Sequence, residues 1–167
     1  MAWPAVGAAM SRSMRSTSPA LCLGRVQIDD YLPHRGAMRL LAGVRAYDRD
    51  TIECLADGHR DPAHPLRAHG RLGAACAIEY AAQAMAVHGA LCGDGQTPPA
   101  GSLLAARDVR FQVARLDDIE EELLIHCHCL ARDARGANYR FLVATASSPL
   151  VSGRATVQFT ALHGHAP

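Results

Sequence analysis

The stretch from Arg71 to Cys92, RLGAACAIEYAAQAMAVHGALC, is small or apolar at nearly every position. It consists mainly of strong helix formers, and no proline interrupts it. A helix that is apolar on all sides is normally buried on all sides. We therefore predict one long central helix over about residues 71–92, enclosed by the rest of the chain.

Two polar residues inside this helix, Glu79 and Gln83, are four positions apart and so lie on one face. A buried carboxylate must be paired, hydrogen-bonded or protonated, because an isolated buried charge is costly. Burial raises the pKa of a carboxyl group, which suits a general acid. The residues alone leave two interpretations of Glu79: a general acid, or a structural glutamate at a subunit interface.

Alternating segments on both sides of the helix predict β-strands. The expected strands are residues 39–47, 51–56, 102–114, 122–131, 137–146 and 152–162. This order indicates an α+β protein in which one antiparallel sheet of five to six strands wraps around one helix, an arrangement known as the hot-dog fold. An exposed sheet edge and a half-covered helix also predict a dimer.

Composition sets the remaining limits. We expect a single hot-dog domain over residues 25–163, a disordered extension over residues 1–24 that is rich in Ala, Ser and Pro, and a frayed tail at 164–167. A net charge of +1 lacks the basic excess typical of nucleic-acid binding. No window has the roughly 18–20 apolar residues of a membrane span. Six cysteines without a secretory segment predict reduced thiols in a cytoplasmic protein.

The loop before the helix, residues 57–70, contains His59, His64 and His69. Histidine is the side chain best suited to proton transfer near neutral pH. The N-terminus of a helix offers free N–H groups that polarise a carbonyl oxygen. Together with Glu79, these groups could abstract a proton next to a carbonyl; the alternative is an exposed loop of solvated histidines.

The sequence HCHC at 126–129 resembles a zinc-ligand cluster, but strand alternation argues against that function. One face is expected to carry Leu123, Ile125, Cys127, Cys129 and Ala131, and the other His126 and His128. Ligands on opposite faces cannot converge on one ion. We therefore predict no metal site, with the cysteines in the core and the histidines toward solvent.

Several arginines could serve an anionic ligand. They are Arg107 and Arg110 on one predicted strand, Arg115 just past its end, and Arg60, Arg67 and Arg71 around the loop. Such arginines usually form a solvated surface. If the substrate is carried on a phosphopantetheine arm, they could instead bind the phosphate or an acidic carrier helix.

Three segments resemble the FabA/FabZ-type 3-hydroxyacyl-(acyl-carrier-protein) dehydratases of the hot-dog superfamily. These are YLPHRGAMRLL at 31–41, AIEYAAQAMA at 77–86 and GSLLAARDVRFQV at 101–113, and the resemblance extends over about residues 28–159. It implies dehydration of 3-hydroxyacyl thioesters on acyl carrier protein to trans-2-enoyl thioesters. In that family a loop histidine is the base and works across the dimer interface with an acid on the helix. By motif the acid is Glu79, with Gln83 as its neighbour.

The loop departs from this pattern. The position of the family histidine holds Pro65, and His64 is one residue away. HPLRAHGRLGAACAIEYAAQ, residues 64–83, is closer to a divergent subgroup from aryl-polyene and related pigment clusters. The resemblance to that subgroup implies a second hot-dog subunit that retains the standard histidine. The implied partners are acyl carrier protein and a homodimeric or heterodimeric hot-dog subunit.

The leading hypothesis is a dehydratase, acting alone or as one half of a heteromer. In it, His64 or His69 removes the α-proton, Glu79 protonates the departing 3-hydroxyl, and amides near Gly73 polarise the thioester carbonyl. It needs no cofactor beyond the carrier's phosphopantetheine. The alternatives are a non-catalytic hot-dog subunit, and an acyl thioesterase in which Glu79 activates water.

Overall fold

The computed structural model describes residues 22–28, 31–32, 36–93 and 101–159. The helices are α1 Arg25–Ile28 and α2 Ala77–Leu91, with 3-10 turns η2 Gly36–Met38, η3 Gly58–Arg60 and η4 Ala74–Cys76. The strands are β1 Leu23–Gly24, β2 Gly43–Tyr47, β3 Thr51–Ala56, β4 Gly101–Phe111, β5 Leu123–Arg132, β6 Gly136–Ala144 and β7 Pro149–Phe159.

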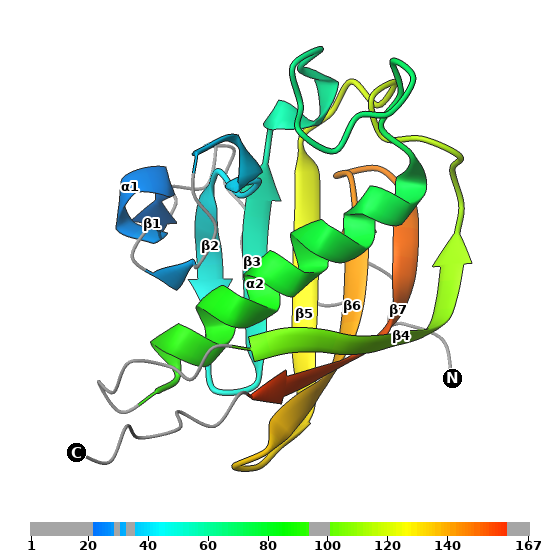
Figure 1. Cartoon of the computed structure of the whole chain (residues 1–167). Coiled ribbons are helices and arrows are strands. Elements are labelled where there is room, and N and C mark those ends of the chain that lie inside the picture. Colours follow the sequence, from blue (N-terminus) through cyan, green and yellow to red (C-terminus); the bar gives the residue numbers. More distant parts are fainter. Residues whose placement is uncertain (1–21, 29–30, 33–35, 94–100, 160–167) are drawn as a thin grey trace, which may run out of the picture.

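The strands form one antiparallel sheet in the order β1-β2-β3-β5-β6-β7-β4, and the sheet curves around α2 (Figure 1). The predicted hot-dog arrangement is confirmed, but the sheet has seven strands rather than five to six. The additional strand is β1, so Leu23 and Gly24 pair with β2 instead of belonging to a disordered extension. Residues 1–21 of the predicted extension lie outside the described residues. Residues 160–167, which include the predicted tail at 164–167, also lie outside them.

The central helix begins later than predicted. Residues 71–73 run beside the segment after β4: Gly73 lies opposite Arg115, and the Ala74 amide donates to the carbonyl of Ala114 at 3.1 Å. The Leu72 amide donates to the Asp117 carboxylate at 3.0 Å. These bonds hold the chain extended, so α2 starts at Ala77 after a single 3-10 turn.

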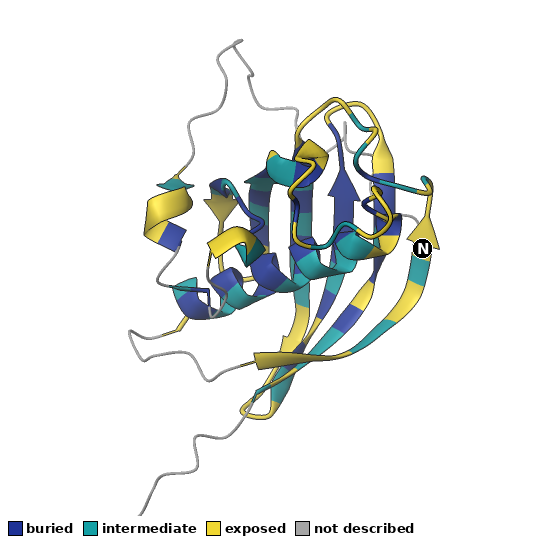
Figure 2. Ribbon diagram, turned by 45° about the horizontal axis from the view of Figure 1, so that its top comes forward, coloured by how far each residue is buried: buried dark blue, intermediate teal, exposed yellow. Residues whose placement is uncertain are grey.

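One face of α2 packs on the concave side of the sheet and the opposite face stays partly open. Tyr80, Ala84 and Val87 are fully buried. Ala82 and Ala86, on the other side, are only half-buried, and Figure 2 shows both buried and half-buried residues along this helix. The sequence predicted that α2 is buried on all sides. Among the described residues, the sheet covers one side of the helix and leaves the other partly exposed.

A β-bulge in β5 changes which side chains face the helix. The predicted alternation is confirmed up to Cys129, since Cys127 is buried under α2 and its neighbours His126 and His128 lie on the outer face. Beyond the bulge Ala131 pairs with Asn138 on the outer face, so its predicted position beside the cysteines is wrong. An extra residue in one strand reverses the alternation that follows.

We predict that Gly153→Ala lowers the free energy of unfolding by about 1–3 kcal/mol. A Cβ there would lie 2.9 Å from Cζ of Phe141 and 3.2 Å from the carbonyl oxygen of Arg107, so the ring and the β4 backbone must move. Chemical denaturation measures the change. Gly58→Ala is the control because its Cβ would meet no atom within 4 Å. Equal stability of the two variants would contradict the assigned packing of β4 on β7.

Candidate active site

Glu79 lies in the first turn of α2 and is half-buried. The side-chain amide of Gln83, one turn later, donates to Glu79 Oε1 at 3.0 Å. Gln83 is fully buried and also donates to the carbonyl of Met38 at 2.8 Å, while its oxygen accepts from the Leu40 amide at 3.0 Å. One amide group therefore orients Glu79 and fixes the segment before β2 against the helix.

His64 belongs to a different pair. It is 7% exposed, and its Nε2 lies 2.9 Å from the hydroxyl oxygen of Tyr80, which is fully buried. Nδ1 accepts from the Leu66 amide at 3.2 Å. Because Nδ1 accepts, Nε2 must carry the proton and donate to Tyr80, so both ring nitrogens of His64 are occupied.

Burial lowers the pKa of His64, and the positive charge of Arg67 lowers it further. Burial also raises the pKa of the Tyr80 hydroxyl. Both effects favour a neutral His64–Tyr80 pair at neutral pH. Glu79 and Tyr80 are consecutive on a helix and so diverge by about 100°. Their side chains therefore serve two different sides of α2.

His69 occupies a tight turn. His69 and Gly70 have φ of 51° and 73°, and the flanking residues Ala68 and Arg71 exchange two backbone hydrogen bonds. Positive φ at both central positions is typical of a two-residue hairpin turn. His69 and Arg71 are both exposed. His59 is 1% exposed, and its Nε2 donates to the carbonyl of Ile119 at 2.9 Å.

Asp117 anchors the loop before the helix. Its carboxylate binds Arg67 at 2.9 Å and also accepts from the guanidinium of Arg115. The hydrogen bond from Arg115 is the main cause that holds the pKa of Asp117 well below its usual range. Arg67 also donates to the carbonyl of Gly70 at 2.9 Å. Arg67 and Arg115 therefore hold the loop in place.

The two predicted strand arginines lie on the outer face of the sheet. Arg107 pairs with Arg154 and Arg110 with Ser152, and a bulge between them brings both to one face although they are three residues apart. Gly73 is exposed, and a Cβ there would meet no atom within 4 Å. The predicted site residues therefore lie in three separate places: Glu79 on α2, the histidines in the loop before the helix, and the two strand arginines on the outer face of the sheet.

Sequence reasoning missed Tyr80 and Asp117. Tyr80 follows Glu79 inside the helix motif and gave no sign of pairing with the loop. Asp117 lies in an acidic run, DDIEEE, where a single buried carboxylate has no distinguishing neighbour. Two surface hollows are described, and neither is lined by Glu79 or His64.

Metal-ligating residues are not grouped in the described part of the chain: no three His, Cys, Asp or Glu side chains come together there. His126 instead contacts Glu53 at 3.3 Å on the outer face. All six cysteines are free thiols.

None of the described helices is long and apolar enough to cross a membrane.

Three comparisons relate the chain to known proteins. A model of the ApeP-like family, described as ApeP dehydratase, matches residues 26–161. No curated protein matches. Among solved structures, a chain of the dehydratase heterocomplex ApeI:P from Xenorhabdus doucetiae is 27% identical, with a TM-score of 0.69, covering 80% of this chain and 90% of that chain.

More distant structures share the fold alone. AziG from S. sahachiroi is 13% identical with a TM-score of 0.53, covering 71% of this chain and 90% of its own. A hypothetical thioesterase with coenzyme A from Streptococcus pneumoniae TIGR4 is 12% identical with a TM-score of 0.52, covering 70% and 84%. Because the family model spans most of the residues, the chain belongs to the ApeP-like dehydratase family and is an enzyme of the dehydratase type.

Proposed function

We propose that the chain is the acid-bearing subunit of a heteromeric dehydratase that acts on 3-hydroxyacyl thioesters of acyl carrier protein. The α-carbon loses a proton, the 3-hydroxyl leaves as water, and a trans-2-enoyl thioester forms. One observation carries the proposal: Glu79 is oriented by Gln83 on the open side of α2, whereas both nitrogens of His64 are engaged.

Glu79 is the group that protonates the departing 3-hydroxyl. Its bond from Gln83 leaves it one defined position, and such preorganisation lowers the cost of reaching the reactive geometry. Gly73 lies just before the 3-10 turn that leads into α2, and its Cα faces open space. Its amide and the N-terminal end of the helix are the groups we assign to the thioester carbonyl.

The base that removes the α-proton could come from this chain or from the partner subunit. A base needs a nitrogen with a free lone pair that can reach the α-proton. In His64 one nitrogen accepts from the Leu66 amide and the other donates to Tyr80, and exposed His69 lies in a turn. We therefore assign the base to a histidine of the partner subunit rather than to His64 or His69.

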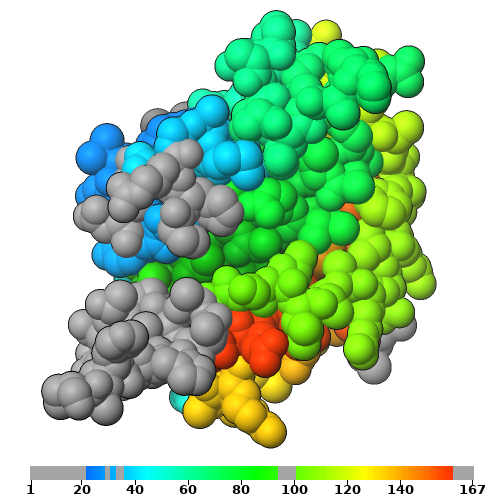
Figure 3. All heavy atoms as spheres, viewed as in Figure 1, coloured from blue at the N-terminus to red at the C-terminus, as the bar shows by residue number. Residues whose placement is uncertain are grey.

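The open edge of the sheet is where a second hot-dog subunit would bind. β4 is an edge strand of 11 residues, and its Leu103 and Phe111 are 40% and 49% exposed. Figure 3 shows the yellow-green atoms of this part of the chain along the margin of the molecule. A long unpaired edge with apolar side chains is a template for another strand. The similar solved structure is described as a heterocomplex of two proteins, which supports a heteromeric partner.

Elimination of water transfers no electrons, so the proposed reaction needs no cofactor other than the phosphopantetheine arm of the carrier. The free thiols are in line with a cytoplasmic location.

Glu79→Gln is expected to lower dehydration by the assembled subunits by at least about 100-fold, because the amide cannot supply the proton. Loss of water from a 3-hydroxyacyl carrier is followed by mass spectrometry. His69→Ala, in the loop before the helix, is the control. Unchanged turnover in Glu79→Gln would make the chain a non-catalytic subunit, and released free thiol in place of water loss would make it a thioesterase.

His64→Asn separates the two sources of the base. If the partner supplies it, the variant keeps turnover within a few-fold of the wild type. A loss as large as that of Glu79→Gln would return the base to His64.

The pH dependence of stability tests the neutral His64. Its lowered pKa means that below about pH 6.5 the unfolded chain binds a proton that the folded chain does not. The wild type should therefore lose stability on acidification, at up to roughly 1.4 kcal/mol per pH unit from this residue, and His64→Asn should lose less. Denaturation between pH 7 and 5 measures both slopes; His69→Asn is the control. Parallel profiles of wild type and His64→Asn would contradict the assignment.

Phe111→Lys is expected to weaken assembly through β4, because a charge would replace an exposed ring at the edge. Size-exclusion chromatography with light scattering follows the chain alone and mixed with its hot-dog partner. Val26→Lys is the matched control, since Val26 is 83% exposed on α1. Assembly by Phe111→Lys equal to that of the control would exclude this edge as the interface.

A further inference from the structure

The residues just before α2 run beside the segment that follows β4, and the hydrogen bonds between them leave one backbone amide over. The Leu72 carbonyl accepts from the Leu116 amide at 2.8 Å. The Ala74 amide donates to the carbonyl of Ala114 at 3.1 Å. Gly73 lies between these two bonds, at a position of the antiparallel pair that makes no bond to the neighbouring segment.

The peptide group that joins Leu72 to Gly73 determines where the Gly73 amide points. In a trans peptide, such as this one, the N–H and the C=O point in opposite directions. Because the Leu72 carbonyl points at Leu116, the Gly73 N–H points away from the segment after β4. No described residue accepts a hydrogen bond from it. The bond that the Leu72 carbonyl accepts also polarises this peptide group, which makes its N–H a stronger donor.

Neither the backbone nor the packing requires a glycine at position 73. Its φ of −63° and ψ of 149° are open to any residue. A Cβ there would meet no atom within 4 Å. A glycine at such a position leaves the backbone accessible to a ligand. The Gly73 amide is therefore both directed and uncovered.

Asp117 holds the residue before this amide. Its Oδ1 accepts from the Leu72 amide at 3.0 Å, so Leu72 is bonded through both its N–H and its C=O. The Asp117 side chain is 1% exposed, and Arg67 and Arg115 both donate to it. A buried ion pair adds little stability compared with well-packed apolar side chains of similar volume. What this carboxylate adds is a fixed position for the peptide group that carries the Gly73 amide.

We propose that Asp117 is a positioning residue for dehydration, and that it holds Leu72 so that the Gly73 amide donates to the thioester carbonyl oxygen. The inference rests on the proposed function, which assigns that oxygen to this amide. When the base removes the α-proton, the electron pair of the C–H bond moves toward the carbonyl and places negative charge on its oxygen. The pair then forms the α–β double bond as the 3-hydroxyl leaves with a proton from Glu79.

The bond from the Gly73 amide becomes stronger as charge develops on the oxygen. An interaction that is stronger in the transition state than in the bound substrate raises kcat rather than lowering KM. A loss of position at Gly73 should therefore appear in kcat.

The test compares Asp117→Ala with Asp117→Asn in the assembled enzyme, each assayed below its own unfolding transition. Alanine removes the acceptor for the Leu72 amide, whereas asparagine retains one. The double variant Arg67→Met/Asp117→Leu also removes the acceptor, and it leaves no unpaired charge at Arg67. The comparison therefore does not depend on the folding of Asp117→Ala.

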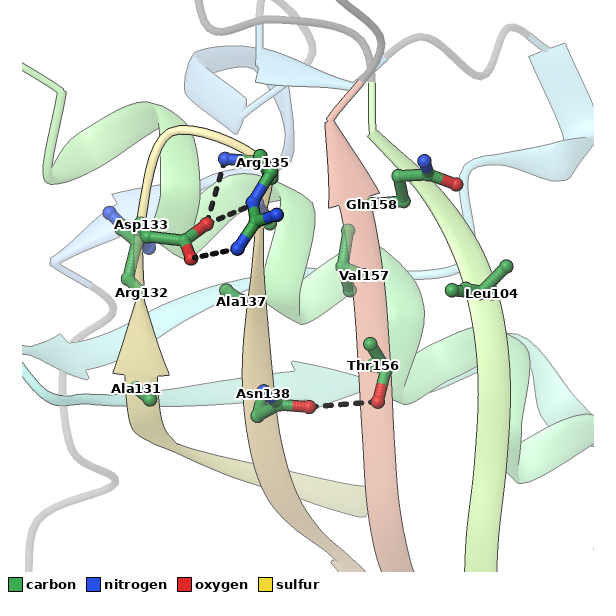
Figure 4. A pocket seen from close by; sticks show the side chains of 11 residues that line it. Leu104, Ala131, Arg132, Asp133, Arg135, Ala137, Asn138, Thr156, Val157 and Gln158 are labelled. Atoms are coloured by element: carbon green, nitrogen blue, oxygen red, sulfur yellow. Dashed lines mark hydrogen bonds and ion pairs between the residues drawn. The ribbon is translucent and has the colours of Figure 1, made fainter.

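Asp133→Ala is the matched control for loss of a carboxylate that binds backbone amides and an arginine. Asp133 accepts from the amides of Arg135 and Gly136 at 2.7 and 3.1 Å, and it lies 3.9 Å from the Arg135 guanidinium (Figure 4). It lies in the turn after β5, at the end of that strand remote from the loop before the helix. Tyr139→Phe controls for loss of stability alone, since it removes a buried bond to His88 at the other end of α2.

Asp117→Ala and the double variant should lower kcat by roughly 10- to 100-fold with KM unchanged, as expected for a displaced oxyanion donor. Asp117→Asn should keep kcat within about threefold of the wild type, because its side-chain oxygen still accepts from Leu72. Infrared spectroscopy of an isotope-labelled saturated acyl thioester reports the carbonyl directly. Its C=O band should fall in frequency on binding to the wild type and move back toward the free value in Asp117→Ala.

Three results would each reduce Asp117 to a structural residue. They are wild-type kcat with an unmoved band in Asp117→Ala, an equal loss in either control, and a loss in Asp117→Asn as large as that in Asp117→Ala.

Failure of the proposed function gives a different result, because the wild-type assembly would then release no water from any 3-hydroxyacyl thioester. The carbonyl band of the saturated thioester still decides the role of Asp117 in that case. A band that does not shift on binding to the wild type overturns the inference.

Discussion

The side-chain amide of Gln83 is the interaction on which the site depends. It is fully buried, and its two ends bond Met38 and Leu40 of the segment before β2 while it also orients Glu79. A buried amide is costly unless its donors and acceptor are satisfied, and here each has a partner. Replacing Gln83 would therefore affect the entry of the chain into the sheet and the position of the Glu79 carboxylate together.

The sequence predicted this part of the molecule because its signals are local. The absence of polar residues from most of α2, and the spacing of Glu79 and Gln83, depend only on helix geometry. The same holds for the opposite faces of His126 and Cys127, which follow from strand alternation. Local patterns of this kind suffice for the fold class and for the contact between Glu79 and Gln83.

The remaining features depend on contacts between segments distant in sequence. Asp117 delays the start of α2 by bonding the Leu72 amide, 45 residues earlier. Tyr80 engages His64 across the loop, and a bulge turns Ala131 outward. A bulge also brings Arg107 and Arg110 to one face. The periodicity of a single sequence does not reveal a β-bulge or a buried ion pair. The contacts of Asp117 and Tyr80 and the two bulges could therefore be found only from the structure.

The Glu79–Gln83 and His64–Tyr80 pairs determine how many sites of the proposed assembly can catalyse the reaction. In a hot-dog pair of the FabA/FabZ type, each subunit offers its acid to one site and its histidine to the other. Under the proposed function, Glu79 completes one site with the partner's histidine. The second site would require a free base from this chain, and His64 is bound to Leu66 and Tyr80. The assembly would then carry one competent site for each pair of subunits, which lets the unused half change its sequence without loss of turnover.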